Sequence, residues 1–241
     1  MLKNIIKSII LLLLIWGFTS VAYTQSDLTA QQQSENTDVE ALHWVDSVFN
    51  SLSLDEKIAQ LFVIRTYSNK DKHFNDSISN LIKKYNVGGL TFFQGSPTRQ
   101  AELTNLWQSK AKTPLLITID AEWGLGMRLD SAYSFPKQMT LGAMQNDTLV
   151  FEMGKSIAGQ CKRLGIQMNF APVVDINSNP KNPVINFRSF GEDPDNVARK
   201  GVAYIKGHQS EGVIATAKHF PGHGDTGSDS HYTLPILEHS I

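Results

Sequence analysis

The stretch Val213-Ile214-Ala215-Thr216-Ala217, followed by Lys218-His219-Phe220-Pro221-Gly222-His223-Gly224-Asp225, shows the pattern on which the chain is built. Its first five residues form an apolar run, which is typical of a short buried strand. The residues that follow are titratable side chains interleaved with glycine and proline. Loops of this kind commonly carry function, although a merely solvated loop is the alternative. The pattern therefore predicts a buried strand whose carboxyl end bears polar chemistry.

Four similar apolar runs precede this strand, and patterns with helical periodicity alternate with them. The apolar runs cover residues 61–64, 88–93, 115–119 and 167–175. The helical patterns cover residues 39–52, 76–85, 98–112, 147–164 and 195–211. A further helix begins at the capping box Ser53-Leu54-Asp55-Glu56. Strands that alternate with longer helices predict parallel βαβ units, and continuously apolar strands indicate a sheet covered on both faces.

Polar residues that follow successive parallel strands favour a (β/α)₈ barrel, in which they surround the mouth of the active site. A doubly wound open sheet is the alternative, but the chain has no Gly-rich phosphate fingerprint to support it. Five strands are predicted in about 200 residues, whereas a full barrel takes about 250. We therefore expect the α/β fold of an incomplete TIM barrel, with about five of its eight βα units in residues 39–241.

The composition excludes several classes of protein. A net charge of −1 gives no support for nucleic-acid binding, which calls for a basic surface. The single cysteine, Cys161, rules out an intramolecular disulfide framework and a cysteine-based zinc site, and its setting predicts a buried helical residue.

The amino terminus has the pattern of a secretory signal peptide. Lys3 and Lys7 precede the apolar run 9–16, and small residues follow near residue 22. We expect a signal peptide over residues 1–24, with an uncleaved anchor as the alternative, and a polar linker over residues 25–38. These segments predict a secreted or periplasmic protein.

Two polar stretches suit a sugar ligand. Asp120, which follows the third strand, can accept hydrogen bonds from hydroxyl groups, and Arg128 can donate to an acid or carbonyl group. Trp123 is either a stacking platform or a core residue. Arg188, which lies between two aromatic residues in a loop, is either a donor to a ligand or an internal brace.

The last loop offers a proton-transfer pair. Asp229 and His231 alternate along the chain, so that in an extended segment the carboxylate can orient the imidazole and raise its basicity. His219 and His223 have the spacing of a metal pair on a helix, but Pro221 and the neighbouring glycines disfavour a helix there. We expect no metal and no cofactor.

The run from Lys218 to Thr226, with Asp229-Ser230-His231, resembles the signature of glycoside hydrolase family 3, and within it the bacterial β-N-acetylhexosaminidase branch. The resemblance extends from about Leu54 to the end of the chain. It implies a (β/α)₈ barrel and retaining hydrolysis of terminal β-linked N-acetylglucosamine from peptidoglycan or chitin-type fragments. The run Asp120-Ala121-Glu122-Trp123-Gly124 departs from the more glycine-rich form of this motif.

The resemblance also implies roles for matched residues. His231 is the expected general acid/base with Asp229 as its partner, and the residues expected to bind the sugar are Asp120, Arg128, Arg188, Lys218 and His219. No acidic residue matches the nucleophile of the family, so we expect these 241 residues alone to be inactive. The alternatives are a family 3 β-glucosidase, a phosphorolytic enzyme, a non-catalytic sugar-binding barrel, and a metal-dependent hydrolase using His219, His223 and Asp225.

Overall fold

The computed structural model describes residues 39–236, and the chain divides into two compact units, Met1–Ser53 and Leu54–Ile241. The described part of the first unit contains a helix over residues 39–51, where the periodicity predicts one. The predicted signal peptide (1–24) and linker (25–38) lie outside the described residues. No helix among residues 39–236 is long and apolar enough to cross a membrane.

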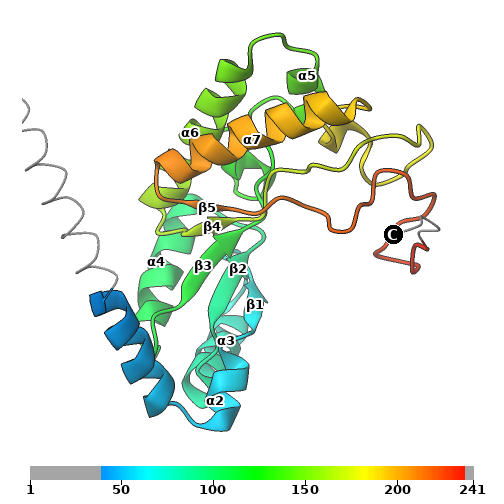
Figure 1. Ribbon diagram of the computed structural model, residues 1–241. Helices are drawn as coiled ribbons and strands as arrows, with labels where there is room; N and C mark the ends of the chain where they lie inside the picture. Colours follow the sequence, from blue (N-terminus) through cyan, green and yellow to red (C-terminus); the bar gives the residue numbers. More distant parts are fainter. Residues whose placement is uncertain (1–38, 237–241) are drawn as a thin grey trace, which may run out of the picture. The chain divides into compact units, whose positions relative to one another are not determined.

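The second unit is built on a parallel sheet whose strand order follows the chain (Figure 1). The described strands are β1 (Val63–Thr66), β2 (Gly89–Phe92), β3 (Leu116–Ile119), β4 (Met168–Asn169) and β5 (Ile214–Ala215). Each strand pairs with the next in parallel. A doubly wound sheet reverses its strand order at a switch point, whereas this order runs in one direction, as in a barrel.

Helices connect the strands, and four of those described begin at a side-chain cap. They are α2 (Leu54–Ala59), α3 (Lys72–Tyr85), α4 (Pro97–Gln108), α5 (Gln138–Gly142), α6 (Asp147–Arg163) and α7 (Pro194–Ser210), with 3₁₀ turns η1 (Leu125–Met127) and η2 (Asn186–Arg188). Asp71 accepts a hydrogen bond from Phe74 N at 2.9 Å, and Ser96 accepts one from Arg99 N at 3.2 Å. Such caps satisfy backbone donors that the first helical turn leaves unpaired.

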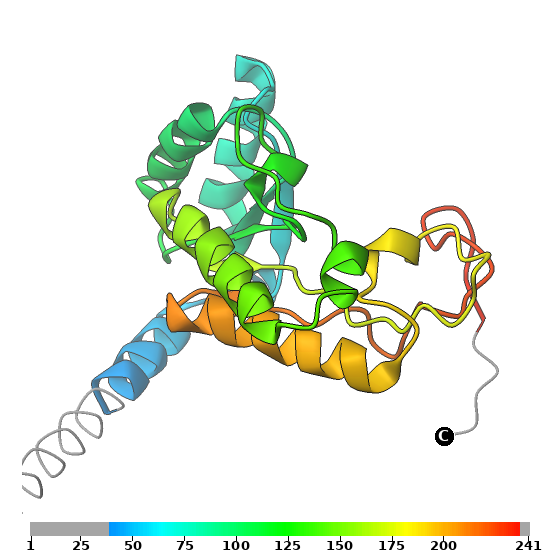
Figure 2. The ribbon, with the colours of Figure 1, turned by 90° about the horizontal axis from the view of Figure 1, so that it is seen from above.

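Helices α6 and α7 lie side by side, as Figures 1 and 2 both show. A Cβ atom on Gly154 would lie 2.5 Å from Tyr204 O, and one on Gly207 would lie 2.2 Å from Phe151 O. Glycine is therefore required at both contacts, because any side chain would push the two backbones apart.

The two faces of the sheet differ in polarity. Leu90, Phe92, Ile117 and Ile119 are fully buried on the face that helices cover, and the Phe92 ring lies 5.9 Å from Trp107 of α4. Successive strand residues point to opposite faces, so the other face carries Arg65, Thr91 and Thr118, which the register places side by side. Asp120 continues the Thr118 series just beyond the end of β3.

The predicted order of strands and helices agrees with the structure, but some boundaries differ. The first strand, predicted over 61–64, is β1 at 63–66, because Leu61 and Phe62 belong to the turn after α2. The strand predicted over 167–175 forms a ladder only at Met168–Asn169, since Pro172 lacks the N–H that a central strand needs. The sequence analysis missed α5, η1 and η2.

Cys161 is buried in α6, as predicted. Burial raises the pKa of its thiol to about 12, so it remains a neutral packing residue at physiological pH.

Candidate functional site

Asp120 lies at the centre of a group of charged side chains beyond the carboxyl ends of β3 and β5. The chain turns through η1 and brings Arg128 back, so that its Nη2 lies 2.6 Å from Asp120 Oδ2 and its Nε donates to Asp120 O at 2.7 Å. Lys218 Nζ lies 2.6 Å from Asp120 Oδ1. The Phe93 ring, 4.8 Å from the guanidinium carbon of Arg128, supports that side chain from a third segment.

Glu122, for which the sequence analysis proposed no role, joins the remaining members of this group. Its side chain is completely buried. Its Oε1 lies 2.7 Å from both Lys218 Nζ and Arg188 Nη2, and its Oε2 accepts a hydrogen bond from Arg188 Nε at 3.0 Å. We call Asp120, Glu122, Arg128, Arg188 and Lys218 the charged cluster. Spacing could have indicated Glu122, because it lies two residues after Asp120.

The charged cluster contains three cations and two carboxylates, which gives a net charge of +1. Burial of Asp120 favours its neutral form, but Lys218 and Arg128 outweigh this effect and hold the pKa of Asp120 below its usual range. Asp120 is therefore ionised at neutral pH and can accept hydrogen bonds from hydroxyl groups. The backbone of Lys218 is fixed as well, since it donates to Pro172 O at 3.0 Å and accepts from Val174 N at 2.7 Å.

The backbone that carries Asp120 and Glu122 is braced from the helix side of the sheet. Asn169 of β4 accepts from Ala121 N at 2.9 Å and donates to Ala121 O at 3.2 Å. Tyr204 of α7 donates its hydroxyl to Glu122 O at 3.0 Å. The amide of Asn169 also lies 3.0 Å from His208 Nε2. These buried contacts fix the direction in which the two carboxylates project.

His219 pairs with Asp175, a second carboxylate to which the sequence analysis gave no role. The distance from His219 Nδ1 to Asp175 Oδ2 is 2.5 Å, and His223 N donates to Asp175 Oδ1 at 2.7 Å. Burial favours the neutral form of Asp175, but the hydrogen bonds and charge of His219 lower its pKa. Asp175 therefore fixes the His219 imidazole and the start of the last loop together.

Asp229 and His231 form the predicted pair, but the backbone conformation of this segment differs from the predicted one. His231 Nδ1 lies 2.7 Å from Asp229 Oδ1, and the backbone N of His231 donates to the same oxygen at 2.9 Å. The segment is thus a turn closed by the aspartate side chain, not an extended strand. The backbone and side-chain hydrogen bonds of His231 lower the pKa of Asp229. The His231 side chain is 75% exposed and so accessible to a ligand.

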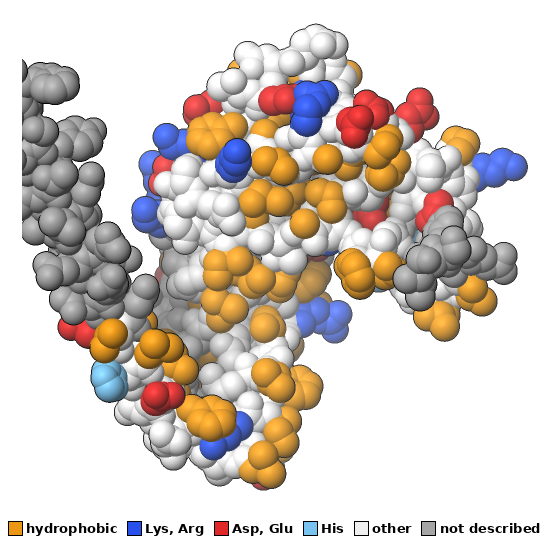
Figure 3. Space-filling model, in the orientation of Figure 1, with side chains coloured by type: hydrophobic (Ala, Val, Ile, Leu, Met, Phe, Trp, Pro, Cys, Tyr) orange, Lys and Arg blue, Asp and Glu red, His pale blue; other side chains and the backbone are white. Residues whose placement is uncertain are grey.

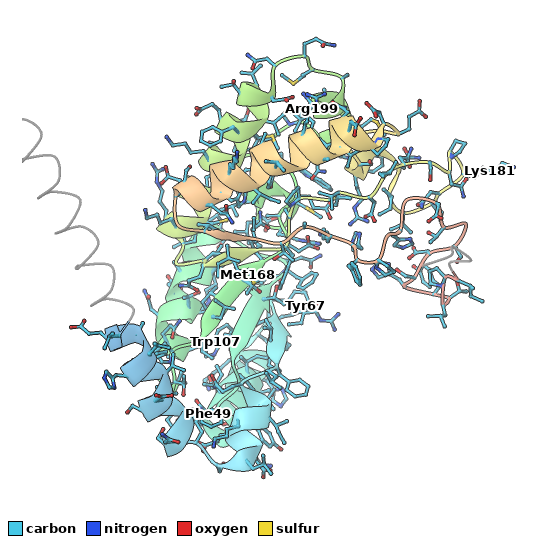
Figure 4. All side chains as sticks on the ribbon, in the orientation of Figure 1. Phe49, Tyr67, Trp107, Met168, Lys181 and Arg199 are labelled. Carbon is cyan, nitrogen blue, oxygen red and sulfur yellow. The ribbon has the colours of Figure 1, made fainter. Side chains whose placement is uncertain are left out.

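The base of this loop is anchored to the segment between β4 and α7, which Lys181 marks in Figure 4. Asn182 Nδ2 donates to His223 O at 2.6 Å, and Asn179 Nδ2 donates to Asp225 O at 3.2 Å. The loop exposes hydrophobic side chains on both sides of this base: Phe220 precedes it, and Tyr232, Leu234 and Ile236 follow it. Hydrophobic side chains are visible at the right of Figure 3.

The structure therefore divides the predicted site residues into three groups. Asp120, Arg128, Arg188 and Lys218 meet in the charged cluster, His219 pairs with Asp175, and His231 pairs with Asp229. Among the hydrogen bonds and salt bridges of residues 39–236, none joins the Asp229–His231 pair to the charged cluster.

The metal-site alternative receives no support from the side-chain arrangement. His219 and His223 have ring centroids 5.9 Å apart, in an edge-to-face arrangement. In the part of the chain that the structure describes, no three histidine, cysteine or acidic side chains are grouped so that they could hold a metal ion.

Fold and site together define a class: a (β/α)-barrel domain with its polar site at the carboxyl ends of consecutive parallel strands. The chain belongs to glycosyl hydrolase family 3, since residues 53–241 match the family model of the glycosyl hydrolase family 3 N terminal domain. The family and the fold class that the sequence predicted are both confirmed.

Individual relatives agree with this assignment. The chain is 42% identical over 175 residues to "Beta-hexosaminidase A" of Pseudoalteromonas piscicida, covering 67% of this chain and 29% of the relative. It resembles the structure of a glycoside hydrolase family 3 beta-N-acetylglucosaminidase from Paenibacillus sp. (TM-score 0.72, 40% identity, 79% and 37% coverage). It also resembles a beta-glucoside phosphorylase (TM-score 0.75, 29% identity, 80% and 34% coverage). The chain thus spans about a third of the length of each.

Proposed function

We propose that the protein is a retaining β-N-acetylhexosaminidase that removes terminal non-reducing N-acetylglucosamine. The observation that carries the proposal is the combination of the charged cluster with the Asp229–His231 pair. The names of the relatives, a beta-hexosaminidase and a beta-N-acetylglucosaminidase, support this choice of sugar.

In this proposal the charged cluster binds the sugar. Ionised Asp120 accepts hydrogen bonds from hydroxyl groups, while Arg128, Arg188 and Lys218 present donors whose directions are set by their carboxylate partners. His219, fixed by Asp175, lines the same subsite.

His231 transfers the proton. It donates a proton to the glycosidic oxygen as the bond to the leaving group breaks, and then takes a proton from the water that releases the sugar. Asp229 fixes its Nδ1, which leaves Nε2 for this transfer. Retaining chemistry also needs a carboxylate nucleophile. No described residue matches the family's nucleophile, so the assays use the full reading frame, and we expect the 241 residues alone to give no turnover.

The test is hydrolysis of a chromogenic N-acetyl-β-glucosaminide by the full-length protein and by His231→Ala. We expect kcat to fall about 100-fold or more with a modest change in KM, because general acid–base catalysis contributes that much. His73→Ala, which alters an exposed histidine of α3, is the matched control. Absence of turnover by the unaltered protein would refute the activity, and full activity of His231→Ala would refute the role of His231.

Phosphorolysis is the second candidate, and its support is the similarity to a beta-glucoside phosphorylase. An imidazole acid/base does not repel an incoming anion as a carboxylate would. Products formed with and without inorganic phosphate distinguish the two reactions, since phosphorolysis yields a sugar 1-phosphate. Comparing β-glucosides with N-acetyl-β-glucosaminides in the same assay tests the β-glucosidase alternative.

We propose peptidoglycan or chitin-type fragments as the natural substrates. We also propose that the protein is secreted or periplasmic. The support for the location is the signal-peptide pattern of residues 1–24. N-terminal sequencing of the mature protein from the extracytoplasmic fraction should begin near Gln25. Recovery of the intact chain from the cytoplasm would contradict the proposed location.

A further inference from the structure

Two ring side chains of α7 reach the segment that joins Asp120 to Glu122. Tyr204 and His208 are four residues apart, so they lie on the same face of the helix, and their rings stack with centroids 4.6 Å apart. Both side chains are completely buried. The Tyr204 hydroxyl donates directly to Glu122 O at 3.0 Å. His208 reaches the same segment through the side chain of Asn169.

The Asn169 side chain continues the hydrogen bonding of the sheet beyond the end of β3. The backbone ladder between β3 and β4 ends where Phe170 N donates to Ile119 O at 2.8 Å. Beyond this point Ala121 N donates to Asn169 Oδ1 at 2.9 Å, and Asn169 Nδ2 donates to Ala121 O at 3.2 Å. A buried N–H without a partner is costly, so Asn169 holds Ala121 in place together with the carboxylates on either side of it.

The Asn169 amide has a second proton, and His208 is the acceptor for it. One proton of Nδ2 is directed to Ala121 O, and His208 Nε2 lies 3.0 Å from the same nitrogen. Because an amide nitrogen only donates, Nε2 must carry a lone pair, and the ring proton is on Nδ1. Burial disfavours the imidazolium form and lowers the pKa of His208 to about 4, so the ring is neutral at neutral pH. An apolar side chain here would leave the second amide proton buried without an acceptor.

We propose that His208 is a positioning residue for sugar binding, which accepts the second amide proton of Asn169 and so fixes the segment carrying Asp120 and Glu122. The inference rests on the proposed function, in which these carboxylates orient the groups that bind the sugar. Within residues 39–236, His208 forms no hydrogen bond or salt bridge with the charged cluster, so its effect passes through Asn169. A histidine that only filled space in the core would need neither a polar ring edge nor this tautomer.

The first test measures kcat and KM for a chromogenic N-acetyl-β-glucosaminide with the full-length protein and its variants. His208→Leu removes the acceptor and should raise KM about 10-fold with less than about a 3-fold change in kcat, because displaced sugar-binding groups weaken binding more than proton transfer. His208→Gln, whose amide oxygen can accept from Asn169, should keep KM within about 2-fold of the unaltered value. Val197→Ala is the matched control, since it removes buried volume from α7 outside this network. It should lower the melting temperature and leave KM unchanged.

The second test determines the tautomer of His208 in the unaltered full-length protein. ¹⁵N NMR of histidine-labelled protein distinguishes a ring protonated on Nδ1 from one protonated on Nε2, and His208→Gln assigns the signal. We expect the Nδ1–H form at neutral pH. The Nε2–H form, or an unchanged KM in folded His208→Leu, would overturn the inference while leaving the activity in place. Absence of turnover by the unaltered protein would overturn the proposed function instead.

Discussion

Glu122 connects three segments that are far apart in the sequence. It follows β3, and its carboxylate contacts Arg188 of η2 and Lys218 beyond β5. A completely buried carboxylate is costly to desolvate, and the two cations compensate for that cost. At the scale of single residues, the positions of two cations of the charged cluster, Arg188 and Lys218, therefore depend on one acid.

We expect Glu122→Gln to lower kcat/KM about 100-fold, because a displacement of about 1 Å in positioning groups can cost that much. The glutamine keeps the shape of the side chain but raises the net charge of the cluster to +2 and presents an amide to the cations. Glu122→Asp keeps the charge with a shorter reach, so it should retain more activity.

The measurements are kcat, KM and the melting temperature of both variants. A role limited to folding would lower the melting temperature and the active fraction without changing the KM of the folded enzyme. Equal kcat/KM values for Glu122→Gln and the unaltered protein would contradict the positioning role.

At the scale of elements, the base of the loop after β5 packs closely against the segment between β4 and α7. This packing fixes the base of the loop. His223 and Thr226 are buried at this base, and a Cβ atom on Gly224 would lie 1.7 Å from Ile176 O. The exposed Asp229–His231 pair therefore projects from a fixed base.

Gly224→Ala should displace this base and lower kcat at least about 10-fold, since a proton-transfer group must lie within hydrogen-bond reach of its target. Gly227→Ala is the matched control, because a Cβ atom there meets nothing within 4 Å. Chromogenic turnover by both variants, with circular dichroism to establish folding, makes the comparison. Unchanged kcat in a folded Gly224→Ala variant would show that the packing of the base does not position His231.

At the scale of the whole molecule, α6 and α7 cover the sheet and bury a polar network against it. His208 of α7 is fully buried, stacks on Tyr204 with ring centroids 4.6 Å apart, and lies 3.0 Å from the Asn169 amide. Asn169 Oδ1 accepts from Ala121 N, so its amide nitrogen faces His208 Nε2, which must then be the unprotonated ring nitrogen. Burial, which disfavours the imidazolium form, lowers the pKa of His208 to about 4.

This pKa makes the stability of the fold dependent on pH. Between about pH 6.5 and pH 4 the unfolded chain binds a proton at His208 that the folded chain does not. The free energy of unfolding should therefore fall, by about 3 kcal/mol in total, as the pH is lowered through this range. The full contribution is present above about pH 6.5, and no further change from His208 is expected below about pH 4.

Urea unfolding of the unaltered protein and His208→Gln at several pH values measures this effect. His208→Gln should be less stable at neutral pH but should lose less stability on acidification. His73→Gln, at an exposed position, should keep the pH dependence of the unaltered protein. Parallel stability curves for the unaltered protein and His208→Gln would contradict the prediction.

The order of the five strands and the longer helices, the barrel class and the location of polar residues at strand ends follow from the sequence alone, whereas α5, η1 and η2 do not. These features are local, because the hydrophobic periodicity that predicts an element extends over that element alone, from 4 residues in β3 to 17 in α7. The pairing of Asp229 with His231 was also predictable, because the two residues are neighbours along the chain.

Which charged side chains meet is set by the three-dimensional fold. Glu122 and Arg188 are 66 residues apart, and Asp120 and Lys218 are 98 apart. Such pairs depend on the register of strands and on the paths of loops, and neither is encoded by nearest neighbours in the chain. Burial made Glu122 and Asp175 important, because a carboxylate removed from water must find a cation or hydrogen-bond donors, and the fold alone determines which ones lie within reach.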